Sequence, residues 1–205
     1  MLSNLGSSDI VIVIVALIVS LVIHEFMHGY VGYLLGDTTA QDQGRLTLNP
    51  LKHIDPFMTI LLPIITIKLL GMPILAAKPV PFNPDRVKYD EYGAAMLAAA
   101  GPLSNLVLAF FGAILATHVF AGNVYWSHVF VIFTQLNVLL CVFNLIPIPP
   151  LDGSRVLYAF APEPLQDLMR MMEPFGIFVV FALVLYGGLS GILSNIELFI
   201  LKLLP

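Results

Sequence analysis

The first apolar run of the chain, from Ile10 to Leu35, carries three ionisable side chains within about one helical turn. The other polar side chains of this run are Ser20, Tyr30 and Tyr33. A helix over the run is about 40 Å long at ~1.5 Å per residue, which is enough to cross a bilayer with some tilt. Ionisable groups are costly at membrane depth, so three that lie together need a common partner there.

These side chains belong to the motif His24-Glu25-Phe26-Met27-His28. Residues i and i+4 of an α-helix share a face, so His24 and His28 can direct both imidazoles at one metal ion. Glu25 lies on the adjoining side, where it can orient and deprotonate a water molecule. The alternative is a chance grouping of two histidines and a glutamate, and the apolar surroundings argue against it.

The composition is that of a membrane protein. Hydrophobic residues make up 59% of the 205 residues and charged residues 11%, whereas soluble domains carry about a quarter charged residues. At roughly 20 apolar residues per span, the length allows four to six membrane segments and no separate soluble domain. The single cysteine, Cys141, excludes a cysteine-ligated zinc site, and no basic nucleic-acid-binding surface is evident. We therefore expect an all-α integral membrane protein, folded as a polytopic helical bundle.

The apolar pattern indicates one membrane-embedded domain over residues 1–205, with a core at about 10–160 and C-terminal helices at about 165–205. Gly36-Asp37 is the predicted stop of the first helix. Further helices are predicted at about 89–120 and 125–146. A last apolar block at 175–204 is interrupted by glycines, so it makes either one span or two.

The connection after the first helix carries two more predictions. Arg45-Leu46-Thr47-Leu48 alternates polar and apolar residues, which predicts a small β-hairpin or edge strand. The apolar run Phe57–Leu70 is short for a span and contains Pro63, so we expect it to enter the membrane and return to the same side. His53 lies between them, and such a loop histidine is either solvated, hydrogen-bonded or close to the functional site.

Charge distribution selects a third metal ligand, because a catalytic zinc usually takes three ligands from the protein. Six of the nine Lys and Arg residues lie between Asp37 and Lys88, which predicts that this side is cytoplasmic and the N-terminus outside. The second half of the first helix is then the cytoplasmic half. The helix at 125–146 returns to that side and delivers Asp152, the expected third ligand. The other candidates fall on the outer side or at the water interface: His118, His128, Asp90 and Glu91.

Two further stretches are unusual for membrane helices. Ala98-Ala99-Ala100-Gly101-Pro102-Leu103-Ser104-Asn105 is a small-residue patch suited to tight helix packing. The buried amide of Asn105 needs a partner, either in an interhelical hydrogen bond or near a substrate. Asn144–Gly153 contains three prolines in four residues, which cannot continue a helix. Broken backbone of this kind at membrane depth often marks a site.

In this order, the motifs His24–His28, Gly101–Asn105 and Asn144–Gly153 resemble those of the site-2 protease family of intramembrane zinc metalloproteases. The resemblance covers most of residues 10–160, which would form the catalytic core. No PDZ-like insertion separates the helices at 89–120 and 125–146, and we expect no C-terminal regulatory domain. The resemblance is therefore to a minimal form, in which substrate selection comes from the membrane part or from a partner.

The resemblance also implies roles for single residues. It implies one Zn²⁺ per chain, bound by His24, His28 and Asp152. Glu25 would be the general base, and Asn144 would help to hold the substrate carbonyl. Asn105 matches a family position near the site.

We expect an endopeptidase of the cell membrane that cuts transmembrane segments of single-span membrane proteins, with its active site toward the cytoplasmic side. The strand at Arg45–Leu48 would pair with the unwound substrate. One alternative is a metal transporter with the same His/His/Asp site, which would need no general base at Glu25. Another is a membrane metalloprotease whose catalytic domain projects into water, and the apolar flanks of the motif argue against it. A regulatory partner or a homo-oligomer stays open.

Overall fold

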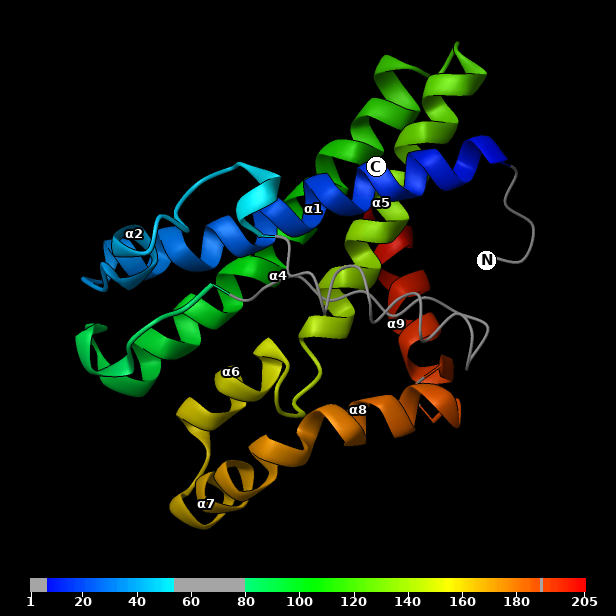
Figure 1. Cartoon of the computed structure of the whole chain (residues 1–205). Coiled ribbons are helices and arrows are strands. Elements are labelled where there is room, and N and C mark those ends of the chain that lie inside the picture. The colour runs from blue at the N-terminus through cyan, green and yellow to red at the C-terminus, as the bar shows by residue number, and fades with distance from the viewer. Residues whose placement is uncertain (1–6, 54–79, 189) are drawn as a thin grey trace.

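The computed structural model describes residues 7–53, 80–188 and 190–205, and every regular element in these ranges is helical (Figure 1). The all-α prediction is therefore confirmed for this part of the chain. The α-helices are α1 (Ser7–Leu34), α2 (Thr39–Asp42), α4 (Asp90–Ile114), α5 (Val124–Asn144), α6 (Asp152–Phe160), α7 (Glu163–Met172), α8 (Gly176–Leu185) and α9 (Ser190–Leu203). Short 3₁₀ turns lie at Pro50–Lys52, Pro84–Arg86 and Glu173–Phe175, and a π-helical turn at Leu115–Val119. The predicted re-entry of Phe57–Leu70 lies outside the described residues.

Three of the described helices are long and apolar enough to cross a membrane. They are Asp9–Leu34, Asp90–Val119 and Val124–Asn144. Large apolar side chains cover their outer faces, and Ile10, Val11 and Val15 are each more than half exposed. Such a surface suits lipid rather than water. The chain is thus a multi-pass membrane protein, while α8 and α9, with 10 and 14 residues, are each shorter than a full span.

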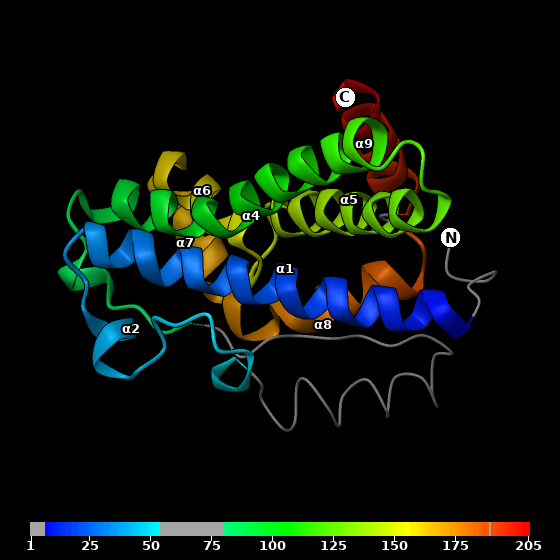
Figure 2. The same cartoon turned by 90° about the horizontal axis from the view of Figure 1, so that it is seen from above.

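Helices α1, α4 and α5 form the central bundle, and α4 and α5 are joined as a long helical hairpin (Figures 1 and 2). The beginning of α1 lies near the connection between α4 and α5, where His128 Nε2 is 3.0 Å from Asp9 Oδ1. Helix α9 covers the α4–α5 hairpin through apolar contacts. Leu193, Ile200 and Leu201 pack against a cluster that includes the fully buried Ala109 and Val138.

The end of α1 and the beginning of α4 lie at the same end of the bundle. Helix α1 stops as predicted at Gly36, whose φ of +102° favours glycine. The N–H of Lys88 donates to the carbonyl of Leu35 (2.9 Å), and the N–H of Asn83 donates to Asp37 Oδ2 (2.7 Å). The connection between the two helices therefore begins and ends on one side, and α1 and α4 run antiparallel.

The C-terminal part of the chain returns to the turn that precedes α6. A Cβ atom at Gly176, where α8 begins, would lie only 2.0 Å from the carbonyl oxygen of Pro149. Helices α6 and α7 thus form an excursion whose two ends meet (Figure 1). The predicted interruption of the last apolar block is confirmed, because α8 ends at Leu185 and α9 begins at Ser190.

The predicted hairpin at Arg45–Leu48 is wrong, since no strand occurs in the described residues. The backbone bonds locally instead: the N–H of Arg45 donates to the carbonyl of Ala40, and that of Thr47 to the carbonyl of Arg45. Arg45 is buried whereas Leu48 is 58% exposed, so the alternation does not mark an apolar face turned to the core. Four alternating residues are too few to specify a strand without a neighbouring strand to pair with. The expected pairing of this segment with substrate loses its basis.

Candidate metal centre

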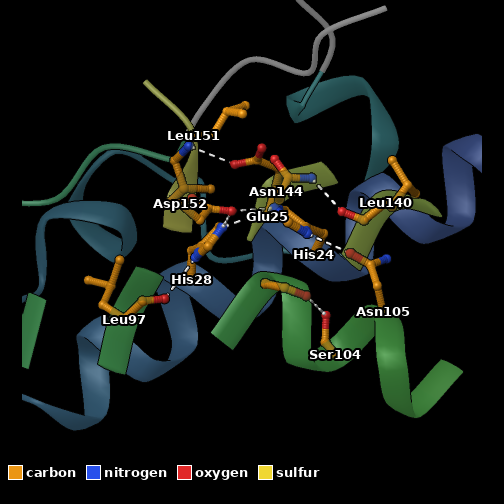
Figure 3. A network of polar contacts seen from close by, with 12 residues as sticks. His24, Glu25, His28, Leu97, Ser104, Asn105, Leu140, Asn144, Leu151 and Asp152 are labelled. Carbon is orange, nitrogen blue, oxygen red and sulfur yellow. Dashed lines mark hydrogen bonds and ion pairs between the residues drawn. The ribbon is translucent and has the colours of Figure 1, made fainter. Parts of the chain in front are cut away.

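The structure brings His24, His28 and Asp152 together in one cluster (Figure 3). The two Nε2 atoms are 3.0 Å apart, and Asp152 Oδ2 lies 3.2 Å from His24 Nε2 and 3.3 Å from His28 Nε2. Both histidines are buried, with 5% and 7% of their surface exposed. The i, i+4 spacing on α1 gives the histidines a common face. The three donor atoms therefore form a nearly equilateral triangle.

Hydrogen bonds from the other ring nitrogens decide which atoms face the centre of this triangle. His24 Nδ1 lies 2.6 Å from Asn105 Oδ1, and His28 Nδ1 lies 2.8 Å from the carbonyl oxygen of Leu97. A carbonyl oxygen only accepts, so each Nδ1 carries the proton and each Nε2 presents a lone pair. Asp152 Oδ2 is also buried and has no hydrogen-bond partner. Three acceptors in contact without a donor need a cation between them.

The triangle fits zinc. Zn–N and Zn–O bonds of about 2.0–2.2 Å in a tetrahedral arrangement place neighbouring donors about 3.3–3.6 Å apart, slightly farther than the separations of 3.0–3.3 Å observed here. Two imidazoles and one carboxylate leave the fourth position open, as catalytic zinc sites require. The donor set therefore fits a catalytic rather than a structural metal.

Helix α4 forms one wall of the cluster, and Gly101 provides the space for it. A Cβ atom at this position would lie 2.4 Å from His28 Nε2 and 2.7 Å from His24 Cε1. No side chain fits there without displacing the imidazoles. The sequence interpretation assigned Gly101 to helix packing and missed its contact with the ligands. The signal for this contact in the sequence is a glycine at the centre of an apolar helix, at a position that can face the histidines.

Asp152 is the first residue of α6 and follows the proline-rich turn directly. The next residue, Gly153, lets this turn close, because its Cβ would lie 2.2 Å from the carbonyl oxygen of Leu145. The end of α5 and the beginning of α6 are thus in backbone contact. This contact directs Asp152 back toward α1.

Glu25 lies beside the cluster (Figure 3), is 9% exposed, and uses Oε2 to accept a hydrogen bond from the N–H of Val80 at 2.8 Å. Val80 stands between Pro79 and Pro81 in the sequence, so its N–H is the only backbone donor of that tripeptide. The residues Val80–Asn83, which we call the strap, are bound at their other end to Asp37. Sequence reasoning missed the contact between the strap and Glu25.

The other predicted residues lie as follows. Asn144 lies at the end of α5, and its Nδ2 donates to the carbonyl of Leu140 at 2.9 Å (Figure 3). Asn105 forms an interhelical hydrogen bond to His24, one of the two partners expected for it. His53 is outside the cluster, and its Nε2 lies 2.8 Å from the carbonyl oxygen of Thr47.

The remaining candidate ligands do not join the cluster. His128 pairs with Asp9, roughly 22 Å from His24 along α1 at ~1.5 Å per residue. Asp90 and Glu91 are exposed at the beginning of α4 and line a cavity whose lining does not include His24, His28 or Asp152. Among the described residues, His24, His28 and Asp152 form the only group of this kind.

A buried His/His/Asp cluster beside a glutamate, with both histidines on a helix long enough to span a membrane, is the arrangement expected of a membrane metallohydrolase. Residues 119–187 match the family model described as Peptidase family M50. The chain is 42% identical over 176 residues to "Putative zinc metalloprotease YwhC" of Bacillus subtilis, covering 82% of this chain and 77% of the relative. It is 33% identical over 188 residues to "Putative zinc metalloprotease Rip2" of Mycolicibacterium smegmatis, covering 88% of this chain and 69% of the relative. No solved structure matches the chain significantly.

The chain therefore belongs to peptidase family M50, the family of the site-2 proteases, and is a metalloprotease. Membership implies Zn²⁺ as the metal, in agreement with the donor set described above. This class makes the metal-transporter alternative the weaker explanation of the cluster, because a transporter gives no reason for a peptidase relationship.

Proposed function

We propose that this protein is an intramembrane endopeptidase that hydrolyses peptide bonds within transmembrane segments of single-span membrane proteins. The observation that carries the proposal is the depth of the buried ligands. His24 lies within the candidate span Asp9–Leu34, about 15 Å along α1 from its polar end at ~1.5 Å per residue. A bilayer core is about 30 Å thick. The reaction would therefore take place at the level of the hydrocarbon core.

In this proposal the protein residues divide the catalytic work. His24, His28 and Asp152 would hold the zinc ion, which would polarise the scissile carbonyl and lower the pKa of a water molecule toward about 7. Glu25 takes the proton from the attacking water, and we assign this transfer to Oε1 because Oε2 accepts the N–H of Val80. Glu25 then returns the proton to the leaving amine. Asn144 is proposed to donate to the substrate carbonyl oxygen.

Water needs a route to a site at this depth. A cavity of about 520 Å³ lies against the turn before Asp152, where Pro149, Pro150 and Ser154 line it. Charged residues of α4, α6, α7 and the 3₁₀ turn after α7 also line it, and include Glu91, Arg155, Arg170 and Glu173. A cavity with this lining supports a supply of water from the polar end of the bundle. The substrate helix must also unwind locally, since an intact helix keeps its peptide groups bonded.

Exchange of the general base tests the activity. The protein and Glu25→Gln are each co-expressed with a panel of single-span membrane proteins, and fragments are identified by mass. We expect fragments cut within the apolar segment from the unchanged protein only, while Glu25→Gln keeps its zinc, because glutamine keeps the shape but cannot accept the proton. Cleavage by Glu25→Gln within tenfold of the unchanged protein would contradict the assigned base. Cuts confined to water-exposed loops would contradict the intramembrane substrate.

We also propose that the metal centre is nearer to the cytoplasm and that the N-terminus is outside. The six basic residues between Asp37 and Lys88 support this orientation. Single cysteines at the exposed positions Gln43, Asp85 and Asn123 test it in a Cys141→Ala background. We expect Gln43→Cys and Asp85→Cys to react only with membrane-permeant reagents in intact cells, and Asn123→Cys to react with an impermeant one. The reverse labelling pattern would mean that the orientation is the opposite of the one proposed.

A further inference from the structure

Two fully buried asparagines connect the metal centre with α5. Asn105 on α4 and Asn137 on α5 both have 0% of their surface exposed. Asn105 Oδ1 lies 2.6 Å from His24 Nδ1, and Asn105 Nδ2 donates to Asn137 Oδ1 at 3.0 Å. Buried amides among apolar helices are retained at a cost in free energy, so their arrangement calls for a specific reason.

The direction of this chain of hydrogen bonds is fixed at the end remote from the metal. Asn137 Nδ2 donates to the backbone carbonyl of Phe133 at 2.8 Å. A backbone carbonyl only accepts, so Oδ1 of Asn137 must face Asn105, and Nδ2 of Asn105 must face Asn137. The carbonyl of Ser20, 3.4 Å from Asn105 Nδ2, favours the same orientation. Oδ1 of Asn105 is consequently left to accept the proton of His24 Nδ1.

We propose that Asn137 is a positioning residue of the metal centre, which acts through Asn105 to set the tautomer of His24. An amide turned by 180° at Asn105 would place its NH₂ group against His24 Nδ1. The imidazole would then carry its proton on Nε2, the atom that must bind the metal. Asn137 excludes this state because its own amide orientation is held by Phe133. The inference concerns metal binding alone and is independent of the substrate proposed above.

The second histidine shows why only His24 needs a positioning residue behind its hydrogen-bond partner. His28 Nδ1 donates directly to the backbone carbonyl of Leu97, which cannot turn around. His24 has a side-chain amide as its acceptor, and an amide presents a donor and an acceptor of nearly the same shape. Asn105 therefore needs a further hydrogen-bond partner, on the side away from His24, that fixes the orientation of its amide.

Three substitutions on α5 separate positioning from simple packing. Asn137→Leu removes the hydrogen bond to Asn105. Asn137→Ser also removes it, but its hydroxyl can donate to Phe133 as Thr134 does to Phe130, so folding is retained. Asn137→Asp, which we expect to be protonated at this fully buried position, keeps an acceptor for Asn105 and a donor for the carbonyl of Phe133. Thr134→Val is the matched control, because it removes a buried hydroxyl of the same helix that bonds only within α5.

The measurements are the zinc dissociation constant, by competition with a fluorescent chelator, and the visible absorption of the Co²⁺-loaded protein. We expect Asn137→Leu and Asn137→Ser to bind zinc about 10–100-fold more weakly, the range for loss of the partner of a metal-ligating histidine, because Asn105 can then turn away its acceptor from His24. Asn137→Asp and Thr134→Val should bind with unchanged affinity and spectrum. If Asn137→Leu does not fold, Asn137→Ser decides. Unchanged affinity in Asn137→Ser, or an equal loss in Thr134→Val, would overturn the proposal.

Discussion

The two histidines of the metal centre are carried by a continuous helix, whereas the aspartate is carried by a short helix that begins directly after a turn. Neighbouring helices hold the histidines through Asn105 and the carbonyl of Leu97. Asp152 depends on backbone contact between its turn and the end of α5, which Gly153 makes possible. One half of the site is thus set by side-chain hydrogen bonds and the other half by the path of the backbone.

This difference determines how each half responds to change. The histidine half is a rigid helix whose spacing alone brings two donors together. The aspartate half exists only if the chain turns sharply after α5, so small changes in backbone packing move the ligand. The following predictions run from the largest expected effect to the smallest and test the two halves against each other, and then the strap that contacts Glu25.

Removal of one ligand from each half should have the largest effect. His24→Ala and Asp152→Ala are each expected to lower the zinc content of the purified protein from about one per chain to near zero, because two ligands do not make a stable catalytic site. Elemental analysis after dialysis measures this, with Thr134→Val as a control remote from the ligands. Full zinc content and activity in Asp152→Ala would mean that the turn does not contribute the third ligand.

Gly101→Ala should disturb the histidine half without removing a ligand. The added methyl group would lie 2.4 Å from His28 Nε2, so an imidazole must leave its position. Overpacking of this kind costs about 1–3 kcal/mol, and we expect it to appear in the free energy of zinc binding. Chelator competition measures the loss. Gly191→Ala, whose methyl group meets nothing within 4 Å, is the matched control and should bind zinc normally.

Gly153→Ala should disturb the aspartate half through the backbone. Its methyl group would lie 2.2 Å from the carbonyl oxygen of Leu145, and backbone atoms cannot turn aside as an imidazole can. We expect a lower Tm of the zinc-free protein, by about 2–4 °C for each kcal/mol lost, together with weaker zinc binding. Thermal unfolding in detergent without metal measures it. If Gly153→Ala leaves the zinc-free Tm unchanged and Gly101→Ala lowers it, the two halves have the opposite character to that described.

Acidification should have the smallest effect on stability. It acts on Asp37, the residue to which the strap is bound. Burial raises the pKa of Asp37, but hydrogen bonds from the Thr39 hydroxyl and from the N–H groups of Asn83 and Thr39, with the charge of Arg86, hold it below its ordinary value. A lowered pKa contributes stability that is complete above the unfolded pKa of about 3.9 and is lost as pH falls through the folded pKa. The Tm difference between the unchanged protein and Asp37→Asn should therefore shrink below about pH 4. Thermal scans between pH 3 and 7 measure this difference. A difference that grows toward acid would contradict the stabilising role assigned to the Asp37 carboxylate.

Local sequence patterns account for the features that depend on one segment. The membrane helices and the stop at Gly36 follow from apolar length and from glycine, and the His24–His28 pair follows from helical spacing. Asp152 could be selected among the candidate ligands from charge distribution, because the choice required only that it lie on the same side of the membrane as the histidines. Gly101 and Val80 could not be found in this way, since their importance arises from contacts with α1 that the sequence does not display. The hairpin failed because a strand needs a partner, and four residues do not reveal whether one is present.

The meeting of Gly176 with Pro149 has a consequence for engineering and for divergence within the family. Because the chain closes a loop there, α6 and α7 form a module that is inserted between two fixed points. Length changes at the turn Ala161–Pro162, far along this module from both points, leave the closure in place. A fluorescent tag or a small domain inserted at this turn should therefore be tolerated, and a relative could acquire a sensor domain there without rebuilding its metal centre.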